Sequence, residues 1–222
     1  MIYFFADNHY EAHPGKRIFE ALPIELKARI RFFEDDWLVL ENEAWEDDCE
    51  LLILNMIGET CGVRYPDGGE VHIEKYIKRG GSVILLHGSS AAFWKSAWWR
   101  KLVGLRWVRP NDPDGAAQST HPIVPCSVTI KKGVKHPLAQ HLKAFSLPTD
   151  EVYINLEQSH ACEVLMETTI AEGTFPQCAV VQTDFGGCLY HFLPGHSEAT
   201  VDGIVSNICE IISFALKSFM CL

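Results

Sequence analysis

The sequence predicts an α/β fold with an open, mostly parallel sheet, helices on both faces and an antiparallel extension at one edge. Three observations predict it. Short, unbroken apolar runs are typical of strands covered on both faces. Amphipathic segments separate these runs in the first half of the chain. The last third instead places strands directly after one another. The 222 residues contain no linker or repeat, so we expect a single domain over residues 1–222.

Strands and helices alternate in the first half of the chain. We expect strands at 1–6, 28–33, 50–57 and 82–87, with the second at an edge of the sheet. The expected helices run from 15 or 16 to 22, from 35 or 36 to 40 and from 71 to 79. The last of these stops at two glycines, as helices commonly do. A tryptophan-rich helix over 93–103 follows the fourth strand.

Strands dominate the second half. We expect extended segments at 127–131, 151–155, 162–167, 179–183 and 188–192, and a helical turn at 136–140. The pair Gly186-Gly187 predicts a hairpin turn between the last two strands. An amphipathic helix over about 201–219 closes the chain.

The composition limits the partners. Hydrophobic residues make up 47% and charged residues 22%, which is enough for a substantial core. A net charge of −10 repels nucleic acid and anionic membranes, so we expect neither as a partner, and a neutral substrate fits this balance better. The apolar runs are too short for a transmembrane helix. The six tryptophans permit an interface in a homo-oligomer.

The cysteines and the first residues predict the compartment. The eight cysteines are scattered and form no CxxC pair. The N-terminal residues lack the basic start and the long apolar stretch of a signal peptide. We therefore expect reduced thiols in a cytoplasmic protein.

The end of the strand over 82–87 is the first candidate site. Ligands of parallel sheets bind outside the carboxyl ends of the strands, and this strand ends in His87-Gly88 followed by Ser89 and Ser90. Either serine is alternatively a cap of the next helix, and His87 a buried, hydrogen-bonded histidine. A serine nucleophile would need a GxSxG turn, which this segment does not match.

Three further segments carry groups suited to acid–base or metal chemistry. His196 and Glu198 follow a Pro-Gly turn, where they suit a hydroxyl-rich ligand or a divalent ion. Alternatively, Ser197 or Glu198 caps the final helix. Asp150 and Glu151 are neighbours on a strand, so only one of them can face a cleft. The loop after the first strand holds three metal-capable groups, or is simply exposed: Asp7, His9 and His13.

Four segments, taken in order, resemble the ThuA-like (trehalose utilisation) family. They are His87 with the aromatic-rich helix over 93–104, the His-Pro pairs at His121 and His136, the Asp-Glu-x-Tyr at 150–153, and the closing segment over 187–198. The resemblance runs from about residue 80 to the end. It implies a flavodoxin-like fold similar to class I glutamine amidotransferases and a role in disaccharide use. Those amidotransferases carry a nucleophilic cysteine where this chain has His87-Gly88-Ser89, so we do not expect glutamine hydrolysis.

These observations predict a protein of carbohydrate metabolism that acts on a disaccharide or keto-sugar. We expect acid–base or metal-assisted chemistry, as in a sugar hydrolase or isomerase, with a saccharide as the small-molecule partner. His87, Glu151 and His196 are the expected catalytic groups and the candidate ligands of a divalent metal such as zinc. Glu151 or His196 would act as general base while His87 orients a substrate oxygen. The expected substrate-binding residues are His9, Ser89, Trp94, Tyr153 and Glu198. The alternative is a non-catalytic module that binds a sugar or metabolite on the same fold.

Overall fold

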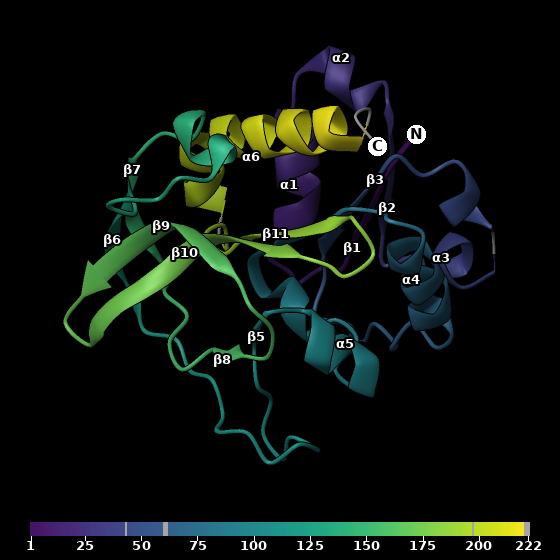
Figure 1. Cartoon of the computed structure of the whole chain (residues 1–222), viewed down its shortest axis with the longest axis horizontal. Helices are drawn as coiled ribbons and strands as arrows, with labels where there is room; N and C mark the ends of the chain where they lie inside the picture. Colours follow the sequence, from purple (N-terminus) through teal and green to yellow (C-terminus); the bar gives the residue numbers. More distant parts are fainter. Residues whose placement is uncertain (43, 60–61, 197, 220–222) are drawn as a thin grey trace.

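Nine strands form one sheet in the order β2-β1-β3-β4-β11-β10-β9-β6-β7 (Figure 1). The computed structural model describes residues 1–42, 44–59, 62–196 and 198–219. The strands of this sheet are β1 (Ile2–Ala6), β2 (Ile30–Glu34), β3 (Leu51–Asn55), β4 (Val83–Leu86), β6 (Ile123–Ile130), β7 (Phe145–Glu151), β9 (Glu163–Ile170), β10 (Gly173–Gln182) and β11 (Cys188–Phe192). Two short strands, β5 (Leu105–Arg106) and β8 (Glu157–Gln158), pair with each other outside it.

The helices are α1 (Pro14–Ala21), α2 (Ile24–Lys27), α3 (Leu38–Asn42), α4 (Gly69–Lys78), α5 (Ala97–Leu102) and α6 (Glu198–Phe219). Short 3₁₀ helices lie at Trp45–Asp47, His87–Ala91 and Pro137–Gln140. None of the helices in the described ranges combines the length and the hydropathy that crossing a bilayer would require. The six cysteines among the described residues are free thiols.

The parallel half of the sheet has the flavodoxin-like strand order. β1 pairs with both β2 and β3, β3 pairs with β4, and β4 pairs with β11, all in parallel. Numbered along the chain, these five strands have the order 2-1-3-4-5 of doubly wound sheets. The predicted α/β fold, with a mostly parallel sheet and an antiparallel extension, is therefore confirmed.

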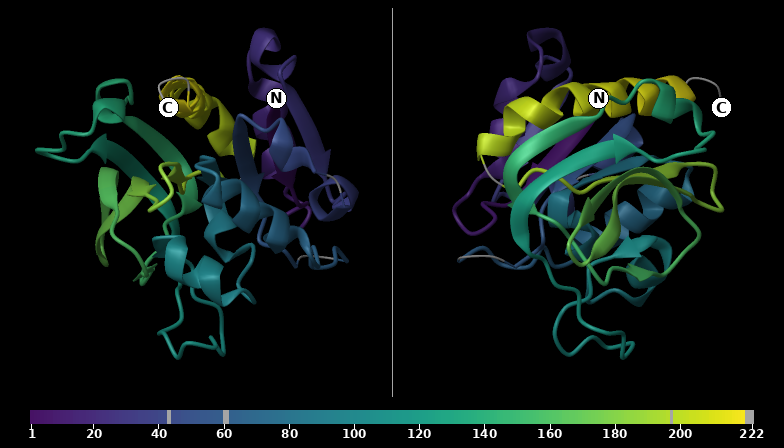
Figure 2. Two further views of the ribbon diagram at one scale, coloured as in Figure 1. Left: turned by 45° about the vertical axis from the view of Figure 1, so that its right-hand side comes forward. Right: turned by 90° about the vertical axis from the view of Figure 1, so that its left-hand side faces the viewer.

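Helices cover both faces of this half, as Figure 2 shows. Side chains alternate along each strand, so Phe4 packs into the apolar cluster under α1 and α6, whereas Phe5 packs into the cluster under α3, α4 and α5. Both phenylalanines are fully buried. The apolar runs in the sequence are unbroken because both faces of these strands are buried.

The antiparallel half curls back over the end of the parallel half. β10 and β11 form the predicted hairpin at Gly186-Gly187, and β9, β6 and β7 continue the sheet. β7 is the outermost strand, yet the ring of Phe145 at its start lies 6.1 Å from the ring of Phe192 in β11. The curled strands are visible in Figure 2. This curvature brings the carboxyl end of β7 next to the carboxyl end of β11.

Several predicted elements have wrong boundaries; the strand expected at 179–183, for example, begins at Gly173, and three others show the cause. The strand expected at 151–155 instead ends at Glu151, and the one expected at 127–131 begins at Ile123. Each contains a proline, Pro148 or Pro125, which disfavours a strand assignment from sequence but is tolerated at edges and bulges. The helix expected at 93–103 is helical only from Ala97 to Leu102, since turns occupy 93–96.

We predict that His191 makes the protein less stable below about pH 6.5. This histidine is fully buried, its Nε2 lies 2.5 Å from the carbonyl oxygen of Val103, and burial lowers its pKa from 6.5 to about 4. Between these values the unfolded chain binds a proton that the folded chain does not, so stability falls as pH falls. At pH 5 this residue should cost about 2 kcal/mol relative to pH 7.

Urea unfolding of the wild type and His191→Gln at pH 7 and pH 5 measures this contribution. The difference in unfolding free energy between the two pH values should be smaller in the variant. His141→Gln is the control, because the His141 side chain is 52% exposed and the substitution should keep the wild-type difference. An unchanged pH difference in His191→Gln would contradict the prediction.

Candidate functional site

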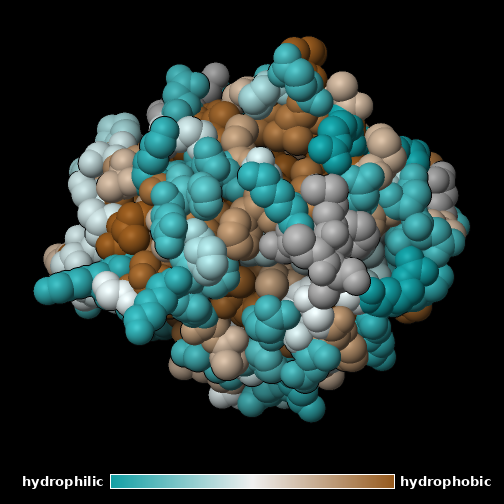
Figure 3. Space-filling model, turned by 45° about the horizontal axis from the view of Figure 1, so that its top comes forward, coloured by the Kyte–Doolittle hydropathy of each residue, from teal (hydrophilic) through white to brown (hydrophobic). Residues whose placement is uncertain are grey.

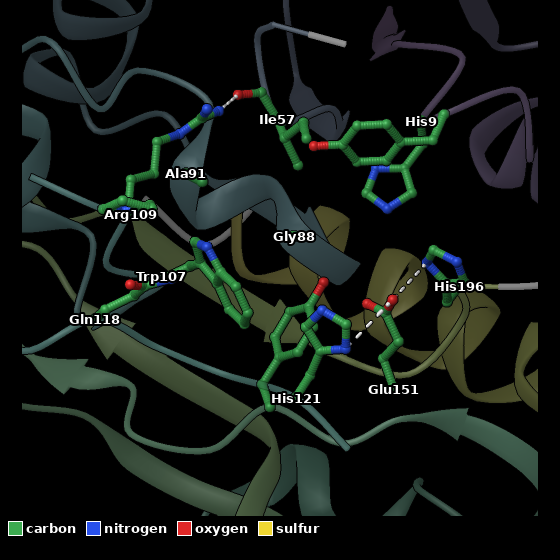
Figure 4. A pocket seen from close by; sticks show the side chains of 13 residues that line it. His9, Ile57, Gly88, Ala91, Trp107, Arg109, Gln118, His121, Glu151 and His196 are labelled. Atoms are coloured by element: carbon green, nitrogen blue, oxygen red, sulfur yellow. Dashed lines mark hydrogen bonds and ion pairs between the residues drawn. The ribbon is translucent and has the colours of Figure 1, made fainter. Parts of the chain in front are cut away.

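A pocket of about 260 Å³ lies at the carboxyl ends of the parallel strands (Figure 4). The loops after β1, β3, β4 and β11 supply part of its wall, and the end of β7 and the segment after β5 supply the rest. The position is the one at which doubly wound sheets bind ligands. The lining residues are His9, Tyr10, Ile57, Gly88, Ala91, Trp107, Arg109, Pro110, Gln118, His121, Glu151, Tyr153 and His196.

His87 presents one defined ring nitrogen to the other side chains of the site. It begins the 3₁₀ helix after β4 with a φ of 51° and is buried. Its Nδ1 lies 3.0 Å from the carbonyl oxygen of Leu193, which can only accept a hydrogen bond, so Nδ1 carries the proton. In the neutral form of the ring Nε2 is then an unprotonated acceptor. Gly88 is required next to it, because a Cβ there would lie 2.8 Å from Ile57 and 3.2 Å from the Tyr153 hydroxyl.

Three polar side chains gather around His87 Nε2 and the carboxylate of Glu151. The Tyr153 hydroxyl lies 2.8 Å from Nε2, the His196 Nδ1 lies 3.2 Å away and Glu151 Oε2 lies 3.4 Å away. The other carboxylate oxygen, Oε1, lies 3.5 Å from Nδ1 of His196 and 3.5 Å from Nδ1 of His121. Figure 4 shows Glu151 between His121 and His196. The carboxylate is therefore the centre of the polar cluster.

Asp150 points away from the pocket and fixes the turn that carries His196. Its carboxylate accepts hydrogen bonds from the backbone N–H groups of Gly195 (2.8 Å) and His196 (3.1 Å). Asp150 is 3% exposed, so these bonds are shielded from water. Of the two neighbouring carboxylates only Glu151 lines the pocket, as strand alternation predicts.

The loop after β1 brings His9 to the same cluster. Its ring centroid lies 4.8 Å from that of His87 and 5.1 Å from that of His196. The ligating atoms of these three histidines all lie within 4.8 Å of one another. Asp7, fully buried, accepts hydrogen bonds from the backbone N–H groups of Ile57 (2.7 Å) and Gly58 (3.2 Å) and so joins the loops after β1 and β3. His13 instead pairs with Glu34, 3.0 Å away.

Burial and neighbouring charges set the protonation states. Burial, together with His87, His196 and His121, lowers the pKa of His9 to about 2, and burial and His87 lower the pKa of His196. Burial would raise the pKa of Glu151, but the hydrogen bond and charge of His87, with the other histidines, hold it below its usual value. Burial and Glu151 raise the pKa of Tyr153 well above its usual value. At neutral pH the imidazoles of His9 and His196 are thus neutral, the carboxylate of Glu151 is ionised and the phenol of Tyr153 keeps its proton.

Five of the eight expected site residues meet here. His9, His87, Glu151, Tyr153 and His196 lie in one cluster. Their convergence comes from strand ends that are far apart in the sequence.

The other three expected residues are placed differently. Ser89 is fully buried and does not line the pocket; its hydroxyl accepts from the Met56 N–H (3.1 Å) and lies 2.8 Å from the Leu54 carbonyl oxygen. It is a structural residue and caps no helix. Trp94 also lies outside the lining, with the Arg109 guanidinium 5.3 Å from its ring centroid. Glu198 is the first residue of α6, and its side chain lies outside the described part of the structure.

Sequence reasoning missed several lining residues between β5 and β6. Trp107, rather than Trp94, is the tryptophan of the pocket, and its ring centroid lies 4.6 Å from that of Tyr153. Its backbone N–H donates to the Ser90 hydroxyl (3.0 Å), so Ser90 positions it. Arg109 and Gln118 line the same wall. The His-Pro pair at His121 was the one signal in the sequence that this segment belongs to the site.

Comparison with known proteins identifies the family. The fold and the histidine-rich site after the parallel strands define a flavodoxin-like α/β protein that lacks a cysteine at the turn after β4. The model of the ThuA family, described as trehalose utilisation, matches residues 7–207. The chain belongs to this family. No curated protein matches the sequence.

Solved structures share the fold at low sequence identity. A ThuA-like protein from Parabacteroides merdae has a TM-score of 0.73 at 14% identity, over 97% of this chain and 88% of that chain. A cytoplasmic protein from Salmonella typhimurium LT2 has a TM-score of 0.60 at 10% identity, over 97% and 99%. A β-galactosidase from Bacillus circulans has a TM-score of 0.58 at 12% identity, with 96% of this chain matching 31% of that one. At such identities the likeness shows the fold alone.

We predict that Ser89→Ala destabilises the protein by about 1–3 kcal/mol, because it leaves the buried Met56 N–H without its acceptor. Chemical denaturation measures this loss. Ser127→Ala is the control. Ser127 is exposed and its hydroxyl pairs with that of Ser146, so removal of this hydroxyl should cost less than about 0.5 kcal/mol. Equal stability of Ser89→Ala and the wild type would show that the hydroxyl has no structural role.

Proposed function

We propose that this protein is a metal-assisted enzyme of carbohydrate metabolism that moves a proton on a sugar, as a keto-sugar isomerase does. One observation carries the proposal: His9, His87 and His196 have ligating atoms within 4.8 Å of one another, and two of them, His9 and His196, line a pocket beside the ionised carboxylate of Glu151. The free cysteines support a cytoplasmic location. The family's description, trehalose utilisation, supports a saccharide as substrate.

The histidines suit a divalent cation such as zinc. Zinc binds neutral imidazole nitrogens at about 2.0–2.1 Å, so two ligands of a tetrahedral site lie about 3.4 Å apart. His87 Nε2 and His196 Nδ1 are separated by 3.2 Å. The Nδ1–H of His87 donates to the Leu193 carbonyl, the kind of supporting bond that orients ligating histidines. Three imidazoles also leave a fourth position open, as catalytic zinc sites do.

The hydroxyl of Tyr153 does not block this arrangement. It lies 2.8 Å from His87 Nε2, but Glu151 is its second hydrogen-bond partner. When a cation takes the lone pair of Nε2, the hydroxyl can donate to Glu151 instead. The cluster therefore keeps its hydrogen bonds in both states.

The remaining groups support proton transfer. A bound cation would polarise a substrate carbonyl and so acidify the neighbouring C–H bond. Glu151, ionised and oriented by His121, would take that proton and return it to the adjacent carbon. Tyr153 keeps its proton and would donate a hydrogen bond to a substrate oxygen. Among the described lining residues Glu151 is the one carboxylate, which fits this chemistry better than the two-carboxylate mechanism of glycosidases.

The size and wall of the pocket support a small sugar. Its volume, about 260 Å³, lies below the range of about 300–1,000 Å³ typical of drug-sized ligands. Trp107 offers an aromatic face and Gln118 an amide, a combination suited to an apolar ring face edged by hydroxyl groups.

A second candidate is a sugar-binding module without catalysis. It is favoured by the lack, among the described residues of the pocket, of a serine or cysteine nucleophile beside the histidines. The two candidates differ in a direct test. The protein is incubated with a panel of disaccharides, keto-sugars and their reduced forms, and products are followed by NMR while binding is followed by calorimetry. Binding without any product over hours would favour the module.

We predict that the purified protein binds about one equivalent of zinc or manganese. Elemental analysis after loading and desalting measures the content. His9→Ala, His87→Ala and His196→Ala should each lose stoichiometric binding, because each removes one ligating nitrogen. His13→Ala is the matched control, since His13 belongs to the loop of His9 but pairs with Glu34. Metal-free wild type after loading would overturn the metal site.

We further predict that Asp150→Asn weakens metal binding about 10–100-fold without unfolding the protein, as losses of supporting partners typically do. The asparagine amide would place N–H groups against the backbone N–H donors of Gly195 and His196 and release the turn. Titration with a competing zinc chelator gives the affinity, and circular dichroism checks the fold. Wild-type affinity in a folded Asp150→Asn protein would exclude Asp150 as a positioning residue.

A further inference from the structure

Arg109 is a cation in the pocket that the proposed proton transfer does not use. The residue lines the cavity, and its guanidinium lies against the Trp94 ring and donates from Nη2 to the Ile57 carbonyl oxygen. In the view of Figure 4, Arg109 and Gln118 lie on one side of Trp107, and Glu151 and His196 lie on the other. The pocket therefore has a cationic end and a histidine–carboxylate end.

No carboxylate among the described residues forms an ion pair with Arg109, and its Nε–H group is buried without a hydrogen-bond partner. The nearby carboxylates whose charge influences Arg109 are already bound to other groups. Glu59 pairs with Lys95 at 3.0 Å, and Asp7 accepts from the backbone N–H groups of Ile57 and Gly58. A guanidinium withdrawn from water is normally compensated by an anion.

We infer that the substrate of this site is an anionic sugar, and that Arg109 binds its carboxylate or phosphate group. This inference rests on the proposed function: the histidine–carboxylate cluster would act on one end of the ligand, and Arg109 would bind the other. The planar guanidinium donates parallel hydrogen bonds that match the oxygens of either group. Gln118 can donate to the same oxygens, and Trp107, between the two ends, would pack against the sugar ring.

The negative charge of the whole protein means that an anionic ligand would need a cation inside the pocket in order to bind. A net charge of −10 repels anions at long range, so an anionic sugar needs a specific partner inside the pocket. The apolar neighbours of Arg109 strengthen its attraction for an anion, because the interaction is screened less than at the surface. A neutral sugar would leave the guanidinium of Arg109 without an anionic partner in the pocket.

Calorimetry with D-glucuronate, D-glucose 6-phosphate and D-glucose tests this inference, using wild type, Arg109→Gln and Lys101→Gln. We expect at least one anionic sugar to bind the wild type about 10–100-fold more tightly than D-glucose, as charge-assisted hydrogen bonds give. In Arg109→Gln this preference should fall below about three-fold. Lys101→Gln should keep it, because Lys101 is an exposed cation that does not line the pocket. Comparison of D-glucuronate with D-glucose 6-phosphate shows whether the site prefers a carboxylate or a phosphate group.

Three outcomes would overturn the inference. One is that neither anionic sugar binds more tightly than D-glucose, which includes the case in which none of them binds. Another is an unchanged preference in Arg109→Gln. The third is an equal loss of affinity for all three sugars in Arg109→Gln, which would make Arg109 a support for the loop of Ile57. The metal content of each sample is measured in parallel, so that a failure of the metal site is seen separately from a failure of anion recognition.

Discussion

The end of β7 is the constraint on which the site depends. Asp150 and Glu151 are consecutive, and alternation along the strand turns one side chain to the Gly195-His196 turn and the other to the pocket. A single strand end thus holds the loop after β11 and supplies the central carboxylate. This is possible only because the antiparallel half of the sheet curls until its outermost strand meets β11. The curvature of the sheet, rather than any local motif, assembles the site.

The electrostatics of the cluster follow from this placement. Four histidines beside one buried carboxylate would repel one another if protonated, and burial adds to that penalty. The pKa values of His9 and His196 are lowered, so their lone pairs are available, and Glu151 stays ionised because the neighbouring histidines favour its charge. Such an arrangement costs stability in the absence of a ligand, which is common at sites selected for chemistry.

The sequence predicted the sheet and the core of the site because both follow simple patterns. Unbroken apolar runs mark the buried parallel strands, and residues directly after them, such as His9, His87 and His196, reach the same edge of the sheet. It failed where the fold departs from pattern. Pro148 disfavoured a strand assignment for the segment that ends at Glu151. Trp107 could not be recognised as the tryptophan of the pocket, in place of Trp94, without the position of the segment after β5. Ser89 follows a strand end as His87 does, yet it turns inward to the backbone of β3. Orientation within a short turn is not encoded in periodicity.

The charge of the chain and the charge of the pocket lead to opposite expectations about the ligand. A net charge of −10 favours a neutral substrate, and this is sound for encounters at the surface. Within the pocket, however, the local balance decides, since nearby unscreened charges outweigh distant screened ones. There the carboxylate of Glu151 is surrounded by histidines, whereas the guanidinium of Arg109 faces no carboxylate of the described chain. A ligand with an anionic group at one end and a carbonyl at the other satisfies both ends at once, which neither a neutral sugar nor a simple anion does.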